Sequence, residues 1–188
     1  MTHPLTRQMR GLRALRRFSD APIPDEVLAD VLEVARWTGT SKNTQPWHIV
    51  VVRDRDALRR LSKLGQFAGH LAGAQVALAL AMESARNAFD CGRLAERVML
   101  AAWVHGIGSC IGSIWGDDNE DKAKELLGVP KERWLHQVIS LGYAADDDAT
   151  RVRTTPATAR ALRTLGRRPL KEMVSWERYG KARELRSS

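Results

Sequence analysis

Cysteine is scarce in this chain of 188 residues, which contains only Cys91 and Cys110. Two isolated cysteines argue against a disulfide scaffold and a cysteine-based zinc cluster, and they indicate reduced thiols in a cytoplasmic protein. The five histidines lack metal-ligand spacing, so no metal site is expected. No apolar run is long enough to cross a bilayer, and the N-terminus lacks the apolar segment of a secretory signal.

Motifs of several enzyme classes are also missing. The sequence has no GxGxxG after a strand, no GxxxxGK followed by Ser or Thr, and no GxSxG. Residues 106–112, GIGSCIG, resemble a dinucleotide-binding loop only superficially, because they follow a predicted helix instead of a strand. Nothing near Cys110 would activate it as a nucleophile, so it is predicted to be a buried apolar thiol.

The net charge of +8 is concentrated at the two ends of the chain. Residues 1–19 contain five Arg and no acid, and residues 151–188 contain eleven basic and three acidic residues. Residues 20–150 contain fourteen basic and nineteen acidic residues. Three interpretations remain: basic arms that bind nucleic acid, two segments that converge on one anion, or a solvated basic surface. The Arg-rich start could also be an organellar transit peptide, but its apolar spacing favours an ordinary helix.

Hydrophobic periodicity predicts helices that alternate with three or four strands, which indicates a sheet covered by helices on both sides. The alanine-rich run at 74–82 leaves a helix open as an alternative to a strand. The basic segment 156–188 has too few apolar residues for a core of its own and needs another surface, such as a partner subunit. We predict helices at 5–17, 24–37, 55–65, 90–106 and 119–129, and strands at 47–54, 74–82 and 136–144.

Arg16 falls on the apolar side of the first predicted helix, with Leu5, Met9, Leu12 and Leu15. A charge in that position must find a partner or reach water, because an unpaired buried charge is costly. Snorkelling toward solvent is one explanation, and a buried anion is the other.

Two polar segments lie at the ends of predicted elements. Residues 40–48, TSKNTQPWH, supply hydroxyls, amides and a cation, and residues 106–113, GIGSCIGS, supply exposed backbone N–H groups. Either segment alone is adequately explained by turn chemistry. Together they favour a cofactor that has a polar ring and a phosphate.

Four segments in this order resemble the FMN-dependent nitroreductase family, from about Leu12 to Arg178. They are LRALRRF, TSKNTQPWHIVVV, DCGRLAERVMLAAWVHGIGSCIG, and LGYA followed later by GRRPLKEMVSW. The resemblance implies an α+β fold, an α/β three-layer sandwich whose mixed central sheet of four to five strands is flanked by helices. It also implies that residues 1–188 form a single FMN-binding domain, and that a basic C-terminal arm, 145–188, is exchanged within a homodimer.

The resemblance further implies an enzyme that works by a ping-pong cycle. NADH or NADPH reduces the flavin at N5, and the reduced flavin then reduces a nitroaromatic, a quinone or an activated alkene. Because the cofactor carries this chemistry, no catalytic side chain is expected. A membrane association is not expected.

Cofactor-binding residues are also implied by the resemblance. Arg13, Ala14 and Arg16 match the opening motif, and Arg167 or Arg168 matches the closing segment that reaches the same phosphate. Thr40, Ser41 and Asn43 match the loop that approaches the flavin, often across the dimer interface, and Gln45 has a binding or structural role. Gln66 matches an amide at the pyrimidine edge. Gly112 and Ser113 match the turn whose backbone N–H groups face N5.

The sequence departs from the family pattern at several positions. Leu12 and Ala14 replace an Arg and a Ser, so the phosphate site has fewer donors, and Gly39-Thr40 replaces Pro-Ser. Lys42 either stabilises the reduced ring or points to solvent. No long lid is evident, which suggests an open site.

Three alternative functions remain open. The chain could be a specialised family member, a flavin destructase or a reductive dehalogenase. It could be a flavin-binding protein with little turnover, or a basic nucleic-acid-binding protein.

Overall fold

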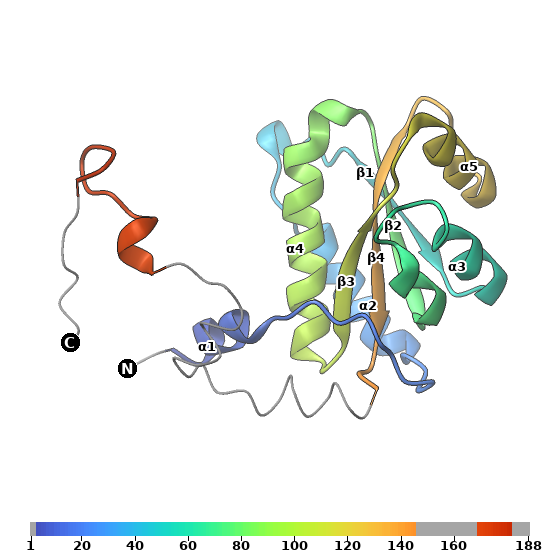
Figure 1. Cartoon of the computed structure of the whole chain (residues 1–188), viewed down its shortest axis with the longest axis horizontal. Coiled ribbons are helices and arrows are strands. Elements are labelled where there is room, and N and C mark those ends of the chain that lie inside the picture. Colours follow the sequence, from blue (N-terminus) through green and yellow to red (C-terminus); the bar gives the residue numbers. More distant parts are fainter. Residues whose placement is uncertain (1–2, 146–168, 182–188) are drawn as a thin grey trace. The chain divides into compact units, whose positions relative to one another are not determined.

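The computed structural model describes residues 3–145 and 169–181 of the chain. The chain divides into two units, residues 1–152 and 153–188. The first unit is built on a four-stranded sheet in the order β1-β2-β4-β3 (Figure 1). These strands are β1 (Trp47–Val52), β2 (Val76–Met82), β3 (Gly108–Ser113) and β4 (Trp134–Gly142). All three strand pairs are antiparallel, and a parallel bridge joins Ala14 to Ser109 of β3.

Helices cover both faces of this sheet, which confirms the predicted α+β three-layer fold. One face carries α2 (Asp25–Arg36) and α4 (Ala88–Val104). The other carries α3 (Arg55–Leu61), α5 (Asp117–Leu127) and the short 3₁₀ helix η2 (Gly69–Gly73), as Figure 1 shows. The remaining elements of this unit are α1 (Pro4–Gly11), η1 (Ser41–Asn43) and η3 (Ala85–Asn87).

Strand β2 lies in the middle of the core, and all seven of its residues are buried. Its side chains alternate, so Val76, Leu78, Leu80 and Met82 pack toward α2 and α4. The intervening residues, Ala77, Ala79 and Ala81, pack toward α3 and η2. Pairing with β1 on one side and β4 on the other satisfies its backbone, which decides between strand and helix for this alanine-rich run.

The first predicted helix is too long. Helix α1 ends at Gly11, and residues 12–18 run in an extended conformation along the sheet, bridging Ala14 to Ser109 and Phe18 to Ala144. The helical-wheel argument for Arg16 is therefore wrong, because Arg16 is not in a helix. Leu5 and Met9, its expected apolar neighbours, are exposed.

A pair of glycines explains why residues 12–18 can lie against the sheet. Gly108 and Gly142 face each other across β3 and β4. A Cβ on Gly108 would lie 2.6 Å from Leu15, and a Cβ on Gly142 would lie 2.7 Å from Phe18. Both distances are shorter than real contacts, so larger residues would push the crossing segment away.

The predicted glycine-rich turn at residues 106–112 is largely a strand, β3, and this corrects the expectation of a loop. Three other boundaries also shift: β1 ends at Val52, α3 ends at Leu61, and α4 begins at Ala88 with Asn87 as its N-cap. Asp90 lies in the first turn of α4 and does not cap it.

The described part of the second unit, residues 169–181, contains the 3₁₀ helix η4 (Leu170–Glu172). The predicted phosphate-binding residues Arg167 and Arg168 lie outside the described residues, as does most of the predicted arm. No helix within residues 3–145 and 169–181 has both the length and the apolar character that a membrane span requires.

Candidate functional site

The outer edge of β3 is crossed by two segments that are far apart in the sequence. Near its start, the Leu15 N–H donates to the Ser109 carbonyl at 2.8 Å. Just beyond its end, the Trp115 N–H donates to the Leu64 carbonyl at 3.3 Å. Among the described residues, no other backbone group bonds to the edge between these two crossings, and Ile111 there is 39% exposed.

The alternation of an antiparallel ladder determines which backbone groups face this open edge. Ser109 and Trp115 bond outward, whereas the Ile114 N–H bonds to the His136 carbonyl of the β4 strand. Ile111 and Ser113 therefore face outward, and their N–H groups donate to no described residue outside the sheet. Gly112 faces Val138 within the ladder. Of the two predicted residues, Ser113 has its N–H available to a ligand.

Side chains on β3 alternate between two environments. Cys110, Gly112 and Ile114 face η2, because a Cβ on Gly112 would lie 3.4 Å from His70 and 3.5 Å from Ala68. Ile111, Ser113 and Trp115 face the opposite way. The Ser113 hydroxyl donates to Gln137 Oε1 at 3.3 Å.

Residues 65–70 pack directly against this part of β3. A Cβ on Gly65 would overlap the Ser113 carbonyl oxygen and lie 3.1 Å from the Ala68 Cβ. Gln66, the predicted partner of the flavin pyrimidine edge, follows Gly65 and is exposed. The tertiary structure thus packs the residue that precedes Gln66 against Ser113, and a role for Gln66 at a flavin stays a prediction.

His70 is buried behind β3, with 8% of its surface exposed. Its Nδ1 lies 2.7 Å from the Ser140 hydroxyl, which in turn donates to the Cys110 carbonyl at 3.2 Å. Both hydrogen bonds form together when Nδ1 carries the proton, so Nε2 is left as a buried acceptor without a partner among the described residues. Burial, and secondarily the charge of Arg16, lowers the pKa of His70. The ring is accordingly neutral at pH 7.

The charge of Arg16 acts on both His70 and Cys110: it favours a lower pKa at each, and the Arg16 side chain also bonds to the Cys110 thiol. Arg16 is exposed, so its guanidinium is accessible to an anion at the β3 edge. Arg13 differs, since its Nη1 donates to the Arg10 and Leu12 carbonyls at 2.7 Å each. Ala14 lies in the bridge to Ser109 and offers no side-chain donor. We call Arg16, Gln66, His70, Gly112 and Ser113 the β3 site.

Both cysteines are buried thiols, as expected for Cys110. Burial raises the pKa of Cys91 to about 11 and also raises that of Cys110, where Arg16 opposes the shift. Because the thiolate is the reactive form, neither cysteine should react with a thiol reagent in the folded protein at pH 8. We expect 5,5′-dithiobis(2-nitrobenzoate) to label neither thiol before denaturation and both afterwards. Rapid labelling of a native thiol would contradict this burial.

The second candidate region is the polar loop, residues 38–45, which leads into β1. Lys42, Asn43 and Gln45 all have positive φ angles, of 52°, 56° and 47°. Such angles are uncommon for residues other than glycine, and several together store strain that the surroundings must offset. The Thr40 hydroxyl accepts from the Gln45 N–H at 3.1 Å, and Gln45 Nε2 donates to the Asn43 carbonyl at 3.3 Å. These bonds hold the loop in its shape.

Ser41, Lys42 and Asn43 are exposed at the tip of this polar loop. The Lys42 side chain has no hydrogen bond or ion pair within the described part of the chain, so only the backbone of the loop determines where its ammonium group points. Whether it lies near a flavin remains a prediction.

In one chain, the polar loop and the β3 site lie at opposite edges of the sheet. The loop enters β1, and β1 and β3 are the outer strands of the order β1-β2-β4-β3. Three strand spacings separate them by about 14 Å. The predicted cofactor-binding residues therefore form two groups in the chain.

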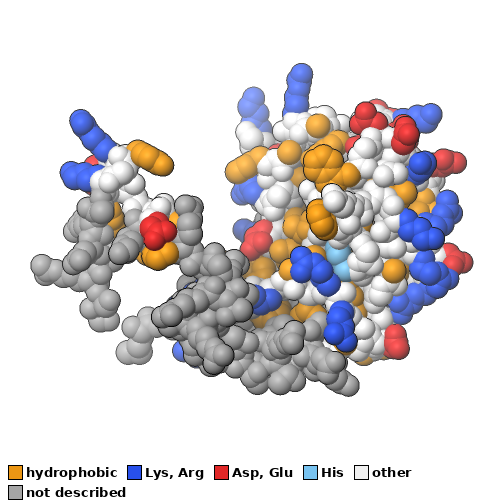
Figure 2. Space-filling model, viewed as in Figure 1, with side chains coloured by type: hydrophobic (Ala, Val, Ile, Leu, Met, Phe, Trp, Pro, Cys, Tyr) orange, Lys and Arg blue, Asp and Glu red, His pale blue; other side chains and the backbone are white. Residues whose placement is uncertain are grey.

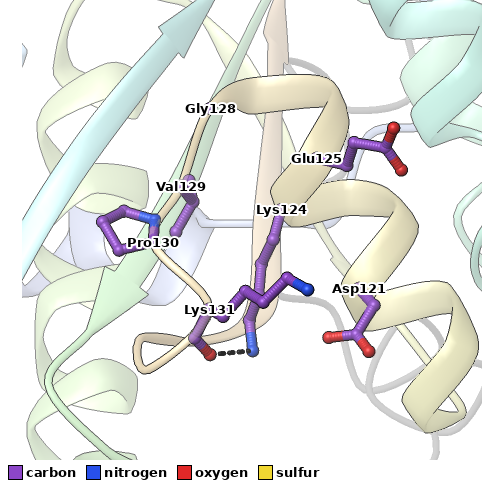
Figure 3. A pocket seen from close by; sticks show the side chains of 7 residues that line it. All are labelled: Asp121, Lys124, Glu125, Gly128, Val129, Pro130 and Lys131. Atoms are coloured by element: carbon purple, nitrogen blue, oxygen red, sulfur yellow. Dashed lines mark hydrogen bonds between the residues drawn. The ribbon is translucent and has the colours of Figure 1, made fainter.

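Surface hollows lie away from the β3 site, one at α5 and another at α4. One, of about 700 Å³, is lined by residues of α5 and the turn after it (Figure 3): Asp121, Lys124, Glu125, Gly128, Val129, Pro130 and Lys131. Lys124 is already bonded there, to Glu120 Oε1 at 2.7 Å and the Lys131 carbonyl at 3.1 Å. Glu120 also accepts from the Leu135 N–H. This cluster joins α5 to the start of β4, so Lys124 has a structural role there.

Comparison with known proteins identifies the family of the chain. The sequence matches the nitroreductase family over residues 9–85 and 63–143. A protein of Archaeoglobus fulgidus, named for NADH dehydrogenase and NAD(P)H nitroreductase activity, is 34% identical over 143 residues, which are 72% of this chain and 82% of that protein. The chain belongs to the nitroreductase family. Nitroreductase NfnB of Mycolicibacterium smegmatis is 29% identical over 198 residues, 76% of this chain and 84% of that protein.

Solved structures of nitroreductase-family proteins share the fold. An FMN-dependent nitroreductase from Clostridium difficile superposes with a TM-score of 0.69 at 23% identity, covering 81% of this chain and 99% of that one. A Bacteroides thetaiotaomicron protein, named for NADH dehydrogenase and NAD(P)H nitroreductase, gives 0.79 at 19% identity over 95% and 100%. At these identities the likeness establishes the fold alone.

Sequence reasoning missed two residues that pack at the β3 site of this nitroreductase-family protein. His70 was set aside as one of five histidines without metal-ligand spacing, and only the fold shows that it lies between Ser140 and Gly112. Gly65 carried no signal, because its closeness to Ser113 depends on a tertiary crossing. Figure 2 shows the face that carries β3, with basic side chains beside a histidine ring.

Proposed function

We propose that this chain is an FMN-dependent oxidoreductase that uses NADH or NADPH to reduce nitroaromatic, quinone or activated-alkene acceptors in a ping-pong cycle. The single observation that supports it best is the edge of β3, where the N–H groups of Ile111 and Ser113 bond to no described residue outside the sheet and lie near Arg16 and Gln66. Family membership and the names of the relatives support the same activity.

The β3 site has the groups that FMN requires. Arg16 is a cation for the phosphate, which is best bound by a guanidinium. The Ser113 N–H and the Gln66 amide would orient the polar edge of the ring. Bound FMN would supply the hydride chemistry, and the residues of this chain would hold the ring and keep it accessible to the donor and the acceptor in turn.

We infer that the site is completed in a homodimer, and that the single flavin-binding domain extends over the whole chain with an exchanged C-terminal arm. The separation of the polar loop from the β3 site supports a second copy, whose loop would contribute Thr40, Ser41, Asn43 and Lys42 to the ring. The outer face of α4 also supports one. Phe89 and Val104 are exposed on this helix, and residues of the same helix line a hollow of about 620 Å³. A partner subunit could cover these apolar side chains.

The decisive experiment is the absorption spectrum of the purified protein. We expect a yellow protein that releases FMN on denaturation and is bleached by NADH or NADPH in the absence of oxygen. A preparation that stays colourless after incubation with FMN would refute the proposal. Colour without bleaching would leave a flavin-binding protein with little turnover, and salt-sensitive binding of DNA or RNA would favour the nucleic-acid alternative.

A further inference from the structure

Trp115 ends a row of three aromatic rings in contact beside the β3 site. Its indole meets the His136 ring edge-on, with 5.8 Å between centroids and an interplanar angle of 70°. His136 stacks on Trp134 at 5.3 Å and 5°. Trp134 packs against the core between the sheet and α4. The row is thus anchored in the core at one end and reaches solvent at the other.

The exposed end of this row is held in place. Trp115 is 63% exposed, although it is among the largest apolar side chains of the protein. Its N–H donates to the Leu64 carbonyl at 3.3 Å, and its carbonyl accepts from Asn119 Nδ2 at 2.9 Å. With both backbone groups bonded and the ring supported by His136, the indole has little freedom to lose when it stacks on a ligand.

The position of Trp115 relates this exposed ring to the β3 site. It follows Ser113 by two residues and lies on the same side of the extended chain, so about 7 Å separates the two along the strand. Phe67, 73% exposed, lies on the segment that packs against Gly112 and Ser113. Figure 2 shows apolar side chains gathered at this end of β3. Two exposed aromatic residues therefore flank the ring-binding end of the site.

We propose that Trp115 is the surface on which a planar aromatic acceptor stacks as it reaches the cofactor, so that this residue selects planar rings over acceptors without a ring. Offset or edge-to-face contact with an aromatic ring is favourable beyond the area that it buries. The proposal rests on the proposed function, because it gives Trp115 a role at that same site.

The test compares the whole protein with three variants: Trp115→Ala, Trp115→Phe and Trp37→Ala. Trp37 is a matched control, since it is 68% exposed and its indole is held on α2, where it donates to Glu33 at 2.8 Å and lies beneath Arg36. Two acceptors are used, the planar quinone menadione and the ringless ferricyanide. In Trp115→Ala we expect the KM for menadione to rise about tenfold while ferricyanide reduction is unchanged. Trp115→Phe should keep most of the menadione affinity, and Trp37→Ala should match the parent protein.

Failure of this inference can be told from failure of the proposed function. If the protein binds FMN and reduces ferricyanide, an unchanged KM for menadione in Trp115→Ala overturns the inference alone. If the protein binds no FMN, the binding of menadione is measured directly by quenching of tryptophan fluorescence. A Kd that weakens in Trp115→Ala but not in Trp37→Ala would then still support stacking, and an equal Kd in both would refute it. Circular dichroism of each variant confirms folding.

Discussion

Replacing Gly65 with alanine should disrupt both the fold and the cofactor site. The new Cβ would overlap the Ser113 carbonyl oxygen, and that atom belongs to the backbone of the sheet edge. A flexible side chain could move aside, but a backbone atom moves only with its strand. We expect a loss of about 2–3 kcal/mol in the free energy of unfolding, in the range of an overpacked core. Urea denaturation measures this loss.

The same substitution should weaken FMN binding, because residues 65–70 and β3 must separate to admit the methyl group. We expect at least a tenfold increase in the Kd for FMN, measured by titrating the apoprotein. Gly69→Ala and Gly73→Ala are matched controls on the same segment, since a Cβ at either position meets nothing within 4 Å. Both controls should be neutral or slightly stabilising. Equal destabilisation by all three substitutions would contradict the packing of Gly65 on Ser113.

Replacing Arg16 with alanine should weaken FMN binding by about 10- to 150-fold. This range corresponds to the roughly 1.5–3 kcal/mol of a hydrogen bond to a charged group. Arg10→Ala is the control, because Arg10 is an exposed arginine in the last turn of α1, whereas Arg16 lies in the segment that crosses β3. Equal losses of affinity in the two variants would show that the phosphate is not bound by Arg16.

A second effect of Arg16→Ala can be measured without any flavin. Arg16 helps to lower the pKa of His70, so its removal should raise that pKa, although burial still holds it below the usual value. Because the pKa of His70 is lower in the folded protein, the unfolded chain takes up a proton on His70 at a higher pH than the folded chain does. The free energy of unfolding therefore falls as the pH drops below about 6.5. This loss should be smaller in the variant.

NMR titration of His70 and urea unfolding between pH 8 and pH 5 check the two statements. An unchanged His70 pKa in Arg16→Ala would place the guanidinium away from β3. Because neither measurement needs FMN, they test the position of Arg16 separately from the proposed function.

Periodicity alone predicted the elements whose burial follows a simple rule. Helix α2 buries Leu28, Val31 and Ala35 at helical spacing, and acidic residues occupy its first turn. Strand β4 has a continuous buried stretch from Val138 to Gly142. In these segments the local preference and the tertiary environment agree, so a pattern of apolar residues was enough.

Prediction was wrong where residues take their structure from a distant neighbour. Residues 12–17 have helical apolar spacing, yet they are extended because Leu15 packs on Gly108 and bonds to Ser109. Residues 108–113 have the composition of a turn, since Gly and Ser disfavour strands. They form β3 because β4 pairs with them, and because glycine leaves room for the segment that crosses the sheet.

The sequence alone determined the family and the layered α+β fold, because these depend on composition, spacing and short motifs. Tertiary structure decided which of those residues meet. It brought Arg16, Gln66 and Ser113 to one strand edge, separated them from the polar loop, and paired His70 with Ser140. Contacts of this kind join segments that are far apart in the sequence, such as Gly65 with Ser113 and Gly108 with Leu15, and no local pattern records them.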